Sequence, residues 1–363
     1  MEDYLEKTIV ENQYPVLTSS QQMGVVLQKD YFADHQVTRD SNIGYYVLPI
    51  GYFTYRSRSD NNVFVFNRNN VINKGIISYF YPVFKPRKVD SDFLLYRLNT
   101  GMRQQLEKAA EGTGQHVLSL KKFKQMEALF PNFKEQQQIG FFLAKLDKTI
   151  TLHQRKLDLL KQKKQFFLQA ILSQQLRFKE FAAPWEKGKL ADYFSERDEK
   201  SSDMEILSVS MRNGIYPACN SDRHTDPGAS ITNYKVVQKG DFVYNSMRLW
   251  QGALGASNYE GIVSPAYVVA KPNSNTVSSF FVRSLSSPKM LNIFLRYSQG
   301  NSKDTLTLKY PEFAKLTVAV PGRKEQEIIS NLFNLLDRLV ALGQKQINLL
   351  EQLKNYYLQN LFI

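Results

Sequence analysis

The chain has 363 residues, 43% of them hydrophobic, so it is long enough for two or three globular domains with real cores. Its single cysteine, Cys219, excludes an internal disulfide and a cysteine-rich zinc site and fits a reducing, cytoplasmic environment, and we expect neither a signal peptide nor a membrane-spanning segment. The net charge of +13 predicts a polyanionic partner, although charge alone fits an inert basic surface equally well.

The first 130 residues are predicted to form a strand-rich α+β domain. Short segments of alternating Val, Ile, Tyr and Phe are punctuated by Gly, Asn and Pro, as in VLTSSQQMGV (residues 16–25), GYFTYRS (51–57) and GIISYFYPVFKP (75–86). A helical stretch is expected at residues 91–111.

A long helix is predicted over residues 131–172. Glu135 lies in the first turns, where the helix dipole favours an acidic side chain, and no run of Gly or Pro follows. Its apolar residues alternate in spacings of four and three, the heptad pattern of a coiled coil. These are Ile139, Leu143, Leu146, Ile150, Leu157, Leu160, Phe167 and Ile171. The seam is broken by His153, which we interpret as a partly exposed seam residue rather than a catalytic one, and by Lys164.

The second half of the chain repeats the first. ILSVSMRNGI (206–215), GDFVYNS (240–246) and GIVSPAYVVAKP (261–272) correspond to the three strand-like segments above, and a helical stretch is expected at 288–298. Residues 321–362 then align with residues 131–172 without a gap, at an offset of 321 − 131 = 190. We therefore predict a pseudo-two-fold α+β protein, with two globular domains and two long helices that form an antiparallel coiled coil.

Catalytic signatures do not occur in the sequence. It has no Walker-type phosphate loop, no dinucleotide fingerprint, no HExxH and no base-methylation motif. The four histidines, His35, His116, His153 and His224, lack metal-ligand spacing. We therefore expect a non-catalytic protein without a metal or cofactor.

Candidate base-reading side chains are concentrated in NSMRLWQGALG (residues 245–255), at the end of a predicted strand. Arg, Asn and Gln carry the paired donors and acceptors that distinguish guanine and adenine edges. For Arg248 the alternatives are a phosphate contact or a surface ion pair, and we interpret Trp250 as a core residue. In the first half, the corresponding loops have matching flanks but different side chains, as expected for two domains that read different sequences. The predicted DNA-binding residues are Asn245, Arg248, Gln251, Arg212 and Arg223, with Arg56, Arg58, Arg68 and Lys74 in the first half.

The chain resembles, over essentially its whole length, the DNA-specificity subunit of type I restriction-modification systems. The most specific features are the two P-x-x-K-E-Q helix starts followed by Leu-Asp (131–147 and 321–337), WEKGKL (185–190) and the segment around GDFVYNSMRLWQGALG. The resemblance implies two target-recognition domains, each reading one half of a bipartite site in double-stranded DNA. It also implies helices that dock two methyltransferase subunits, with restriction endonuclease subunits outside them.

The expected division is 1–130 for the first target-recognition domain, 131–180 for the first helical region, 181–319 for the second target-recognition domain and 320–363 for the second helical region. At the offset of 190, a counterpart of WEKGKL would precede Met1, so the first domain is expected to lack its opening strand. Basic residues on the outward helix faces are the expected docking residues, although such runs are usually only solvated. They are Lys145, Lys148, Arg155, Lys161 and Lys163.

Two other functions fit parts of the pattern. One is an enzyme, a nuclease or methyltransferase whose site the sequence does not reveal; incubation with DNA, Mg²⁺ and a methyl donor would expose it. The other is a structural protein that only dimerises through its coiled coil. A salt-dependent affinity for DNA separates that function from the one we favour.

Overall fold

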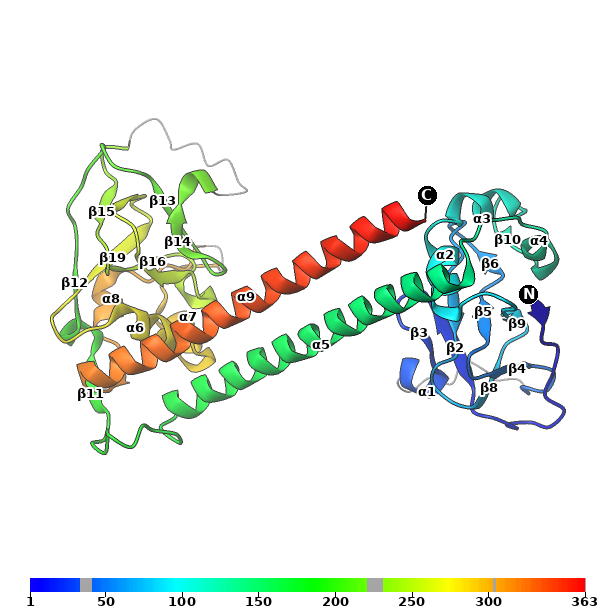
Figure 1. The fold of residues 1–363 in the computed structure, drawn as a ribbon. Helices are drawn as coiled ribbons and strands as arrows, with labels where there is room; N and C mark the ends of the chain where they lie inside the picture. The colour runs from blue at the N-terminus through cyan, green and yellow to red at the C-terminus, as the bar shows by residue number, and fades with distance from the viewer. Residues whose placement is uncertain (33–40, 221–230, 303–304, 363) are drawn as a thin grey trace. The chain divides into compact units, whose positions relative to one another are not determined.

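The computed structural model describes residues 1–32, 41–220, 231–302 and 305–362. The chain divides into two compact units, unit 1 (Met1–Lys156 with Gly343–Ile363) and unit 2 (Leu157–Leu342). Each unit contains one strand-rich domain, called its head below, and parts of two long helices, α5 (Phe133–Leu172) and α9 (Arg323–Leu361). Both helices run without a break (Figure 1).

The head of unit 1 is built around a sheet with the strand order β1-β9-β5-β7, beside the strand pairs β2-β3, β4-β8 and β6-β10. Its strands are β1 (Glu2–Asp3), β2 (Leu17–Ser20), β3 (Gly24–Leu27), β4 (Tyr46–Pro49), β5 (Phe53–Tyr55), β6 (Arg58–Ser59), β7 (Phe66–Arg68), β8 (Lys74–Ile77), β9 (Val83–Lys85) and β10 (His116–Val117). Its helices are α1 (Gln28–Tyr31), α2 (Ser91–Asn99), α3 (Arg103–Ala109) and α4 (Leu120–Lys124). Because alternate residues of a strand share a face, Phe53 and Tyr55 of β5 both enter a core completed by Phe123 of α4.

The head of unit 2 has the sheet order β12-β19-β16-β17, beside the pairs β13-β14, β15-β18 and β11-β20. Its strands are β11 (Glu186–Lys189), β12 (Phe194–Glu196), β13 (Leu207–Ser210), β14 (Gly214–Pro217), β15 (Lys235–Val237), β16 (Phe242–Asn245), β17 (Leu254–Ala256), β18 (Gly261–Val263), β19 (Tyr267–Pro272) and β20 (Thr317–Val320). Its helices are α6 (Ser278–Leu285), α7 (Pro288–Tyr297) and α8 (Tyr310–Ala314), with 3-10 helices η1 (Leu190–Asp192), η2 (Ala218–Asn220) and η3 (Leu249–Gln251).

The two heads share one topology. Strands β1, β9, β5 and β7 correspond in order to β12, β19, β16 and β17, and the hairpin β2-β3 corresponds to β13-β14. The hairpin registers also agree, since Leu17 faces Leu27 and Leu207, at the offset of 190, faces Pro217. The predicted fold class, α+β with two strand-rich heads and two long helices, is therefore confirmed.

The helical stretch expected at residues 91–111 is two helices, α2 and α3, rather than one. The break contains Gly101, where the backbone passes close to the end of α9: a Cβ at this position would lie 2.6 Å from the carbonyl oxygen of Phe362. Only glycine fits there without a shift. Helix α6 was not predicted, since Ser278–Leu285 is short and rich in Phe and Ser.

The two long helices pack antiparallel within each unit. In unit 1, Asp147 of α5 forms an ion pair with Lys354 of α9 at 2.6 Å, and the ring of Phe142 contacts that of Tyr357. Residues earlier in α5 thus contact residues later in α9. In unit 2, Lys164 forms an ion pair with Asp337, while Ile171 lines an apolar pocket with Leu332 and Leu336.

Lys164 and Lys354, which break the heptad seam at equivalent positions, each bind the repeated aspartate of the other helix. A residue from the head completes each contact. Tyr96 of α2 donates its hydroxyl to Asp147 at 2.6 Å, and Arg283 of α6 donates to Asp337 at 2.8 Å. Each aspartate therefore joins α5, α9 and one head helix in a junction, which fixes the head on the helix pair inside its own unit.

Acidification should weaken the junction in unit 2. Burial acts to raise the pKa of Asp337, but the hydrogen bonds from Lys164 and Arg283 outweigh it and lower the pKa below its ordinary value. A carboxylate with a depressed folded-state pKa contributes stability above its unfolded pKa and loses it as the pH falls through the folded pKa. Asp337→Asn should therefore be less stable than the wild type near neutral pH.

The stability difference between Asp337→Asn and the wild type should shrink as the pH falls below about 4. Urea unfolding at neutral pH and at successively lower pH measures it. Glu351→Gln, which changes an exposed carboxylate of the same helix, should show no such pH dependence. A difference of equal size at every pH would contradict a role for the Asp337 charge.

Candidate nucleic-acid interface

A polar pocket of about 630 Å³ opens on the head of unit 1, where the β2-β3 hairpin meets the connection after β5 and strand β7. Side chains able to hydrogen-bond to base edges line it, among them Gln21, Gln22, Arg56, Arg58, Asn61 and Asn67. Two of the predicted residues, Arg56 and Arg58, are therefore brought together in one concave site.

The end of β5 positions these two arginines. Tyr55 is fully buried, and its hydroxyl donates to the carbonyl oxygen of Leu118 at 3.0 Å, so the strand is fixed immediately before Arg56. Arg56 and Arg58 are both exposed. The Arg58 guanidinium lies over the ring of Phe80, 4.6 Å from its centroid, and this stacking leaves the N–H groups at the guanidinium edge available to acceptors.

Gln21 and Gln22 form the exposed tip of the β2-β3 hairpin and were missed by the sequence analysis. The hairpin is held against β7 by Asn67, whose amide donates to the Ser19 hydroxyl at 2.8 Å and to the Ser20 carbonyl at 2.9 Å. The sequence does contain a signal for Gln22, because this residue lies at the offset of 190 from Arg212, which is a predicted DNA-binding residue.

In unit 2 the candidate residues occupy two adjoining elements. Arg212 is exposed at the tip of the β13-β14 hairpin. Asn245 ends β16, and Arg248 precedes η3, donating to the side-chain oxygen of Gln251 at 3.1 Å. The structure thus groups Asn245, Arg248 and Gln251. Trp250 is half-buried against the main core of the unit.

Three predicted DNA-binding residues are not part of these groups. Arg68 is mostly buried and forms an ion pair with Asp92 at 2.6 Å, and Lys74 forms one with Glu6 at 3.3 Å. Arg223 lies outside the described residues. A DNA contact by any of the three stays a prediction.

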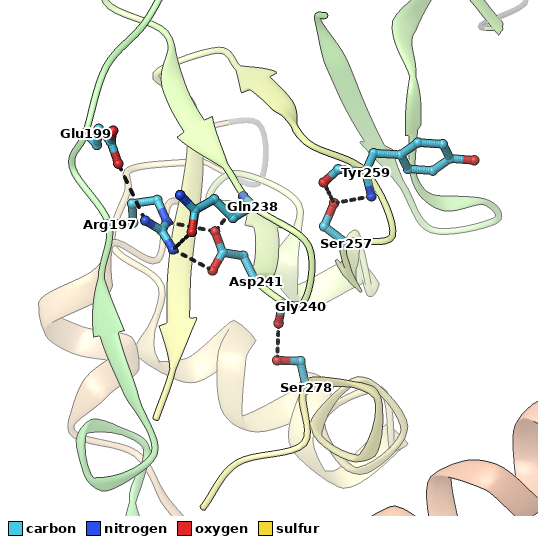
Figure 2. Close-up of polar contacts among 8 residues, drawn as sticks. All are labelled: Arg197, Glu199, Gln238, Gly240, Asp241, Ser257, Tyr259 and Ser278. Atoms are coloured by element: carbon cyan, nitrogen blue, oxygen red, sulfur yellow. Dashed lines mark hydrogen bonds and ion pairs between the residues drawn. The ribbon is translucent and has the colours of Figure 1, made fainter. Parts of the chain in front are cut away.

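A buried ion pair supports the strand that carries Asn245 (Figure 2). The Arg197 guanidinium donates to both carboxylate oxygens of Asp241, at 2.8 and 3.2 Å, and Asp241 is only 2% exposed. Asp241 also accepts from the backbone N–H of Gln238 at 2.8 Å. The hydrogen bond that Arg197 donates to Asp241 raises the pKa of Arg197 above its ordinary value, although burial opposes it. The pair therefore ties the chain after β12 to the turn that leads into β16.

The opposite side of that turn is held by a head helix. The Ser278 hydroxyl at the start of α6 donates to the carbonyl oxygen of Gly240 at 2.5 Å (Figure 2). Gly240 has φ of +91°, a left-handed conformation that glycine adopts without strain. The turn before β16 is thus fixed from two sides.

The five basic residues predicted to dock other subunits, Lys145, Lys148, Arg155, Lys161 and Lys163, are all exposed on α5. Helix α9 carries a feature that was not predicted, a stripe of exposed apolar side chains called the α9 stripe below. It consists of Ile328, Leu335, Leu339 and Leu342 in unit 2 and Leu349, Leu353 and Tyr356 in unit 1. The spacings of seven, or of four and three, form a second heptad repeat beside the seam, so the signal was present in the sequence.

Among the residues that the structure describes, no group of three or more His, Cys, Asp or Glu side chains could hold a metal ion. In the part of the chain that the structure describes, no helix has the length and apolar character needed to span a membrane.

Comparisons with known proteins place these features in context. Residues 6–162 match the family model of the type I restriction modification DNA specificity domain. No curated protein sequence matches the chain. The fold is similar to that of the S subunit of a type I restriction-modification system from M. genitalium, with 13% sequence identity and a TM-score of 0.57, over 100% of this chain and 99% of that one. A further match is the HsdS subunit from Thermoanaerobacter tengcongensis, with 13% identity and a TM-score of 0.48, over 93% of this chain and 85% of that one.

The family model that matches residues 6–162 describes a DNA specificity domain. The fold likeness to the M. genitalium subunit extends over the whole of both chains. The predicted resemblance is thereby confirmed: residues 6–162 match the model of the type I restriction modification DNA specificity domain, and the fold of the whole chain is similar to that of the M. genitalium S subunit.

Proposed function

We propose that this chain reads a bipartite double-stranded DNA target, with one half-site bound by each head. The observation that carries the proposal is that the same two structural positions recur in both heads with different side chains. The hairpin tip bears Gln22 in unit 1 and Arg212 in unit 2, and the residue after the buried tyrosine of the central strand is Arg56 in unit 1 and Asn245 in unit 2. Two domains that read different half-sites need the same backbone structure with different side chains at the positions that contact the bases.

The candidate residues of both heads can form hydrogen bonds to base edges. Arginine can bind guanine O6 and N7 through two hydrogen bonds, and Asn or Gln can bind adenine N6 and N7 in the same way. The net charge of +13 would supply the salt-dependent attraction to phosphates that brings such residues to the duplex. We retain 1–130, 131–180, 181–319 and 320–363 as the proposed domain limits.

Arg248→Ala tests the proposed reading surface of unit 2. If Arg248 binds a guanine edge, the variant should lose about 1–3 kcal/mol of binding free energy and lose discrimination at one base of one half-site. If it contacts a phosphate, the affinity should fall evenly across sequences and the salt slope should fall by about one.

Binding to a panel of single-base variants at two salt concentrations distinguishes the two roles of Arg248. Lys289→Ala removes one exposed positive charge from the same unit and serves as the control. If Arg248→Ala behaves like this control in both affinity and salt slope, Arg248 has no place in the DNA interface.

The proposed partners are two methyltransferase subunits docked on the helices, with restriction endonuclease subunits outside them. The α9 stripe supports this assignment, because a helix that exposes a second apolar heptad repeat can lay it against a partner helix. The exposed basic residues of α5 could add electrostatic attraction to an acidic partner surface.

Leu335→Glu should weaken capture of the methyltransferase subunit at least tenfold, since it places a charge in an apolar contact and each 1.4 kcal/mol is about a factor of ten. Ala341→Glu is the matched control, because Ala341 is also exposed on α9 but lies outside the stripe. Pull-down at a series of chain concentrations measures both variants. Equal capture by the two variants, or capture by a chain from which both helices have been deleted, would contradict docking through α9.

A further inference from the structure

Exposed methionines lie beside candidate reading residues in both heads. They are Met23, Met211 and Met247, which adjoin Gln22, Arg212 and Arg248 in the sequence. Apart from Met1, the other methionines are buried or half-buried. Long apolar side chains are thus exposed at the positions where the heads are proposed to meet DNA. Since covering apolar surface is favourable, these side chains fit an apolar group on the bound DNA.

Met247 lies between β16 and η3 on a fixed backbone. Its N–H donates to the side-chain oxygen of Asn245 at 3.0 Å, and its carbonyl oxygen accepts from the indole N–H of Trp250 at 3.1 Å. The preceding residue, Ser246, donates through its backbone N–H and its hydroxyl to the carbonyl oxygen of Ala266, at 3.1 and 2.7 Å. The Met247 side chain is therefore 42% exposed on a backbone that is held from both sides.

Arg58 occupies the same structural position in unit 1. The preceding residue, Ser57, makes the matching contacts, because its backbone N–H and hydroxyl donate to the carbonyl oxygen of Phe80 at 2.9 and 2.8 Å. The carbonyl oxygen of the serine accepts the backbone N–H of Leu118 in unit 1 and of Leu308 in unit 2, at 2.9 Å in each case. The residue that follows this serine therefore has the same backbone position in both heads.

The two residues at this position differ in what they can bind. The guanidinium of Arg58 donates hydrogen bonds and lies in the polar pocket of unit 1. The thioether of Met247 has no donor, so it offers mainly apolar contact. In the major groove the apolar group that base edges present is the C5-methyl of thymine. Of the four bases, thymine is therefore the one that the Met247 side chain can distinguish.

We propose that Met247 reads a thymine in the half-site bound by unit 2, through apolar contact with the C5-methyl group. The inference rests on the proposed function, in which Asn245 and Arg248, on either side of Met247, bind base edges of the same half-site. Removing one methyl group from water changes the affinity by about fourfold. Met247 thus adds recognition of an A·T pair to a surface whose other candidate residues act through hydrogen bonds.

Deoxyuridine is the probe, because it has the hydrogen-bonding edge of thymidine without the methyl group. The full chain, assembled with the proposed methyltransferase subunits, is titrated with duplexes that contain the bipartite motif found by methylation mapping in the host. In each duplex one thymidine is replaced by deoxyuridine. At one position the replacement should weaken binding of the wild type about fourfold. It should have no effect on Met247→Ala, which should bind the unmodified duplex about fourfold more weakly than the wild type does.

Two further variants separate methyl recognition from a loss of structure. Met247→Leu keeps an apolar side chain of similar volume and should retain the deoxyuridine effect. Leu295→Ala removes an apolar side chain that is 36% exposed on α7, and it should bind every duplex as the wild type does. All of these variants should fold normally, because the side chains that they change are exposed.

Two results would overturn the inference while the proposed function stands, provided that the wild type prefers the motif to a scrambled duplex. One is that no deoxyuridine replacement weakens its binding. The other is that the full deoxyuridine effect persists in Met247→Ala, since the methyl group would then be read elsewhere. If the wild type binds the motif and the scrambled duplex equally, the proposed function itself fails, and the role of Met247 fails with it.

Discussion

Asp241→Ala should lower the free energy of unfolding of unit 2 by about 3–5 kcal/mol, because removing one partner of a buried ion pair leaves the other charge uncompensated. Arg197, which donates two hydrogen bonds to Asp241, would remain in a largely buried position without its carboxylate. The backbone N–H of Gln238 would lose an acceptor as well.

Denaturant unfolding followed by tryptophan fluorescence measures this loss in unit 2 selectively, because Trp185 and Trp250 both belong to that unit. Asp203→Ala, which removes an exposed carboxylate from the same head, should change the stability by no more than about 0.5 kcal/mol. If Asp241→Ala lowered the free energy of unfolding by no more than this control, the ion pair would not stabilise the position of β16.

The double variant Arg56→Ala/Arg58→Ala should weaken DNA binding by about 2–6 kcal/mol, since each arginine that reads a guanine contributes about 1–3 kcal/mol. The loss of discrimination should be confined to one half-site, because both arginines line the pocket of unit 1. The other half-site should keep its full sequence preference.

This effect is measured as the binding affinity for targets mutated in one half-site or the other, with the chain assembled with the proposed methyltransferase subunits. Lys108→Ala/Lys121→Ala is the matched control, because it removes the same charge from exposed positions of unit 1 outside the pocket. Equal weakening by both double variants at every sequence would mean that Arg56 and Arg58 act only as positive charges.

The long helices were predictable because their signals are local. Proline, an early glutamate and a heptad repeat mark residues 131–172 as a helix, and α5 runs over Phe133–Leu172. The two lysines of the seam were recognised only as interruptions. Their partners, Asp147 and Asp337, become visible only once the helices are paired antiparallel, since each contact joins residues far apart in the chain.

The candidate reading surfaces were predicted only in part, for the same reason. Arg248 and Gln251 are close in sequence, and the structure places them together. The pocket of unit 1 combines a hairpin tip, a strand end and a neighbouring strand, and no pattern within one segment brings Gln22 beside Arg56. Arg68 looked similar to Arg56 as an isolated residue, but β7 directs it toward Asp92.

The contacts of Glu325 could not be predicted from the sequence. Arg177 and Trp185, which bind its carboxylate, lie 148 and 140 positions away from it in the chain. Only the folded unit 2 shows what a carboxylate at that position binds.

Mapping DNA methylation across the genome of the host with and without this gene tests whether each head reads one half of a bipartite target. We predict that one bipartite motif loses methylation in both halves when the gene is deleted. Methylation should return with the wild-type gene, while Arg56→Ala/Arg58→Ala should relax the sequence of one half only. An identical methylation map with and without the gene, or a motif whose two halves change together in the arginine variant, would show that the two heads do not read separate half-sites.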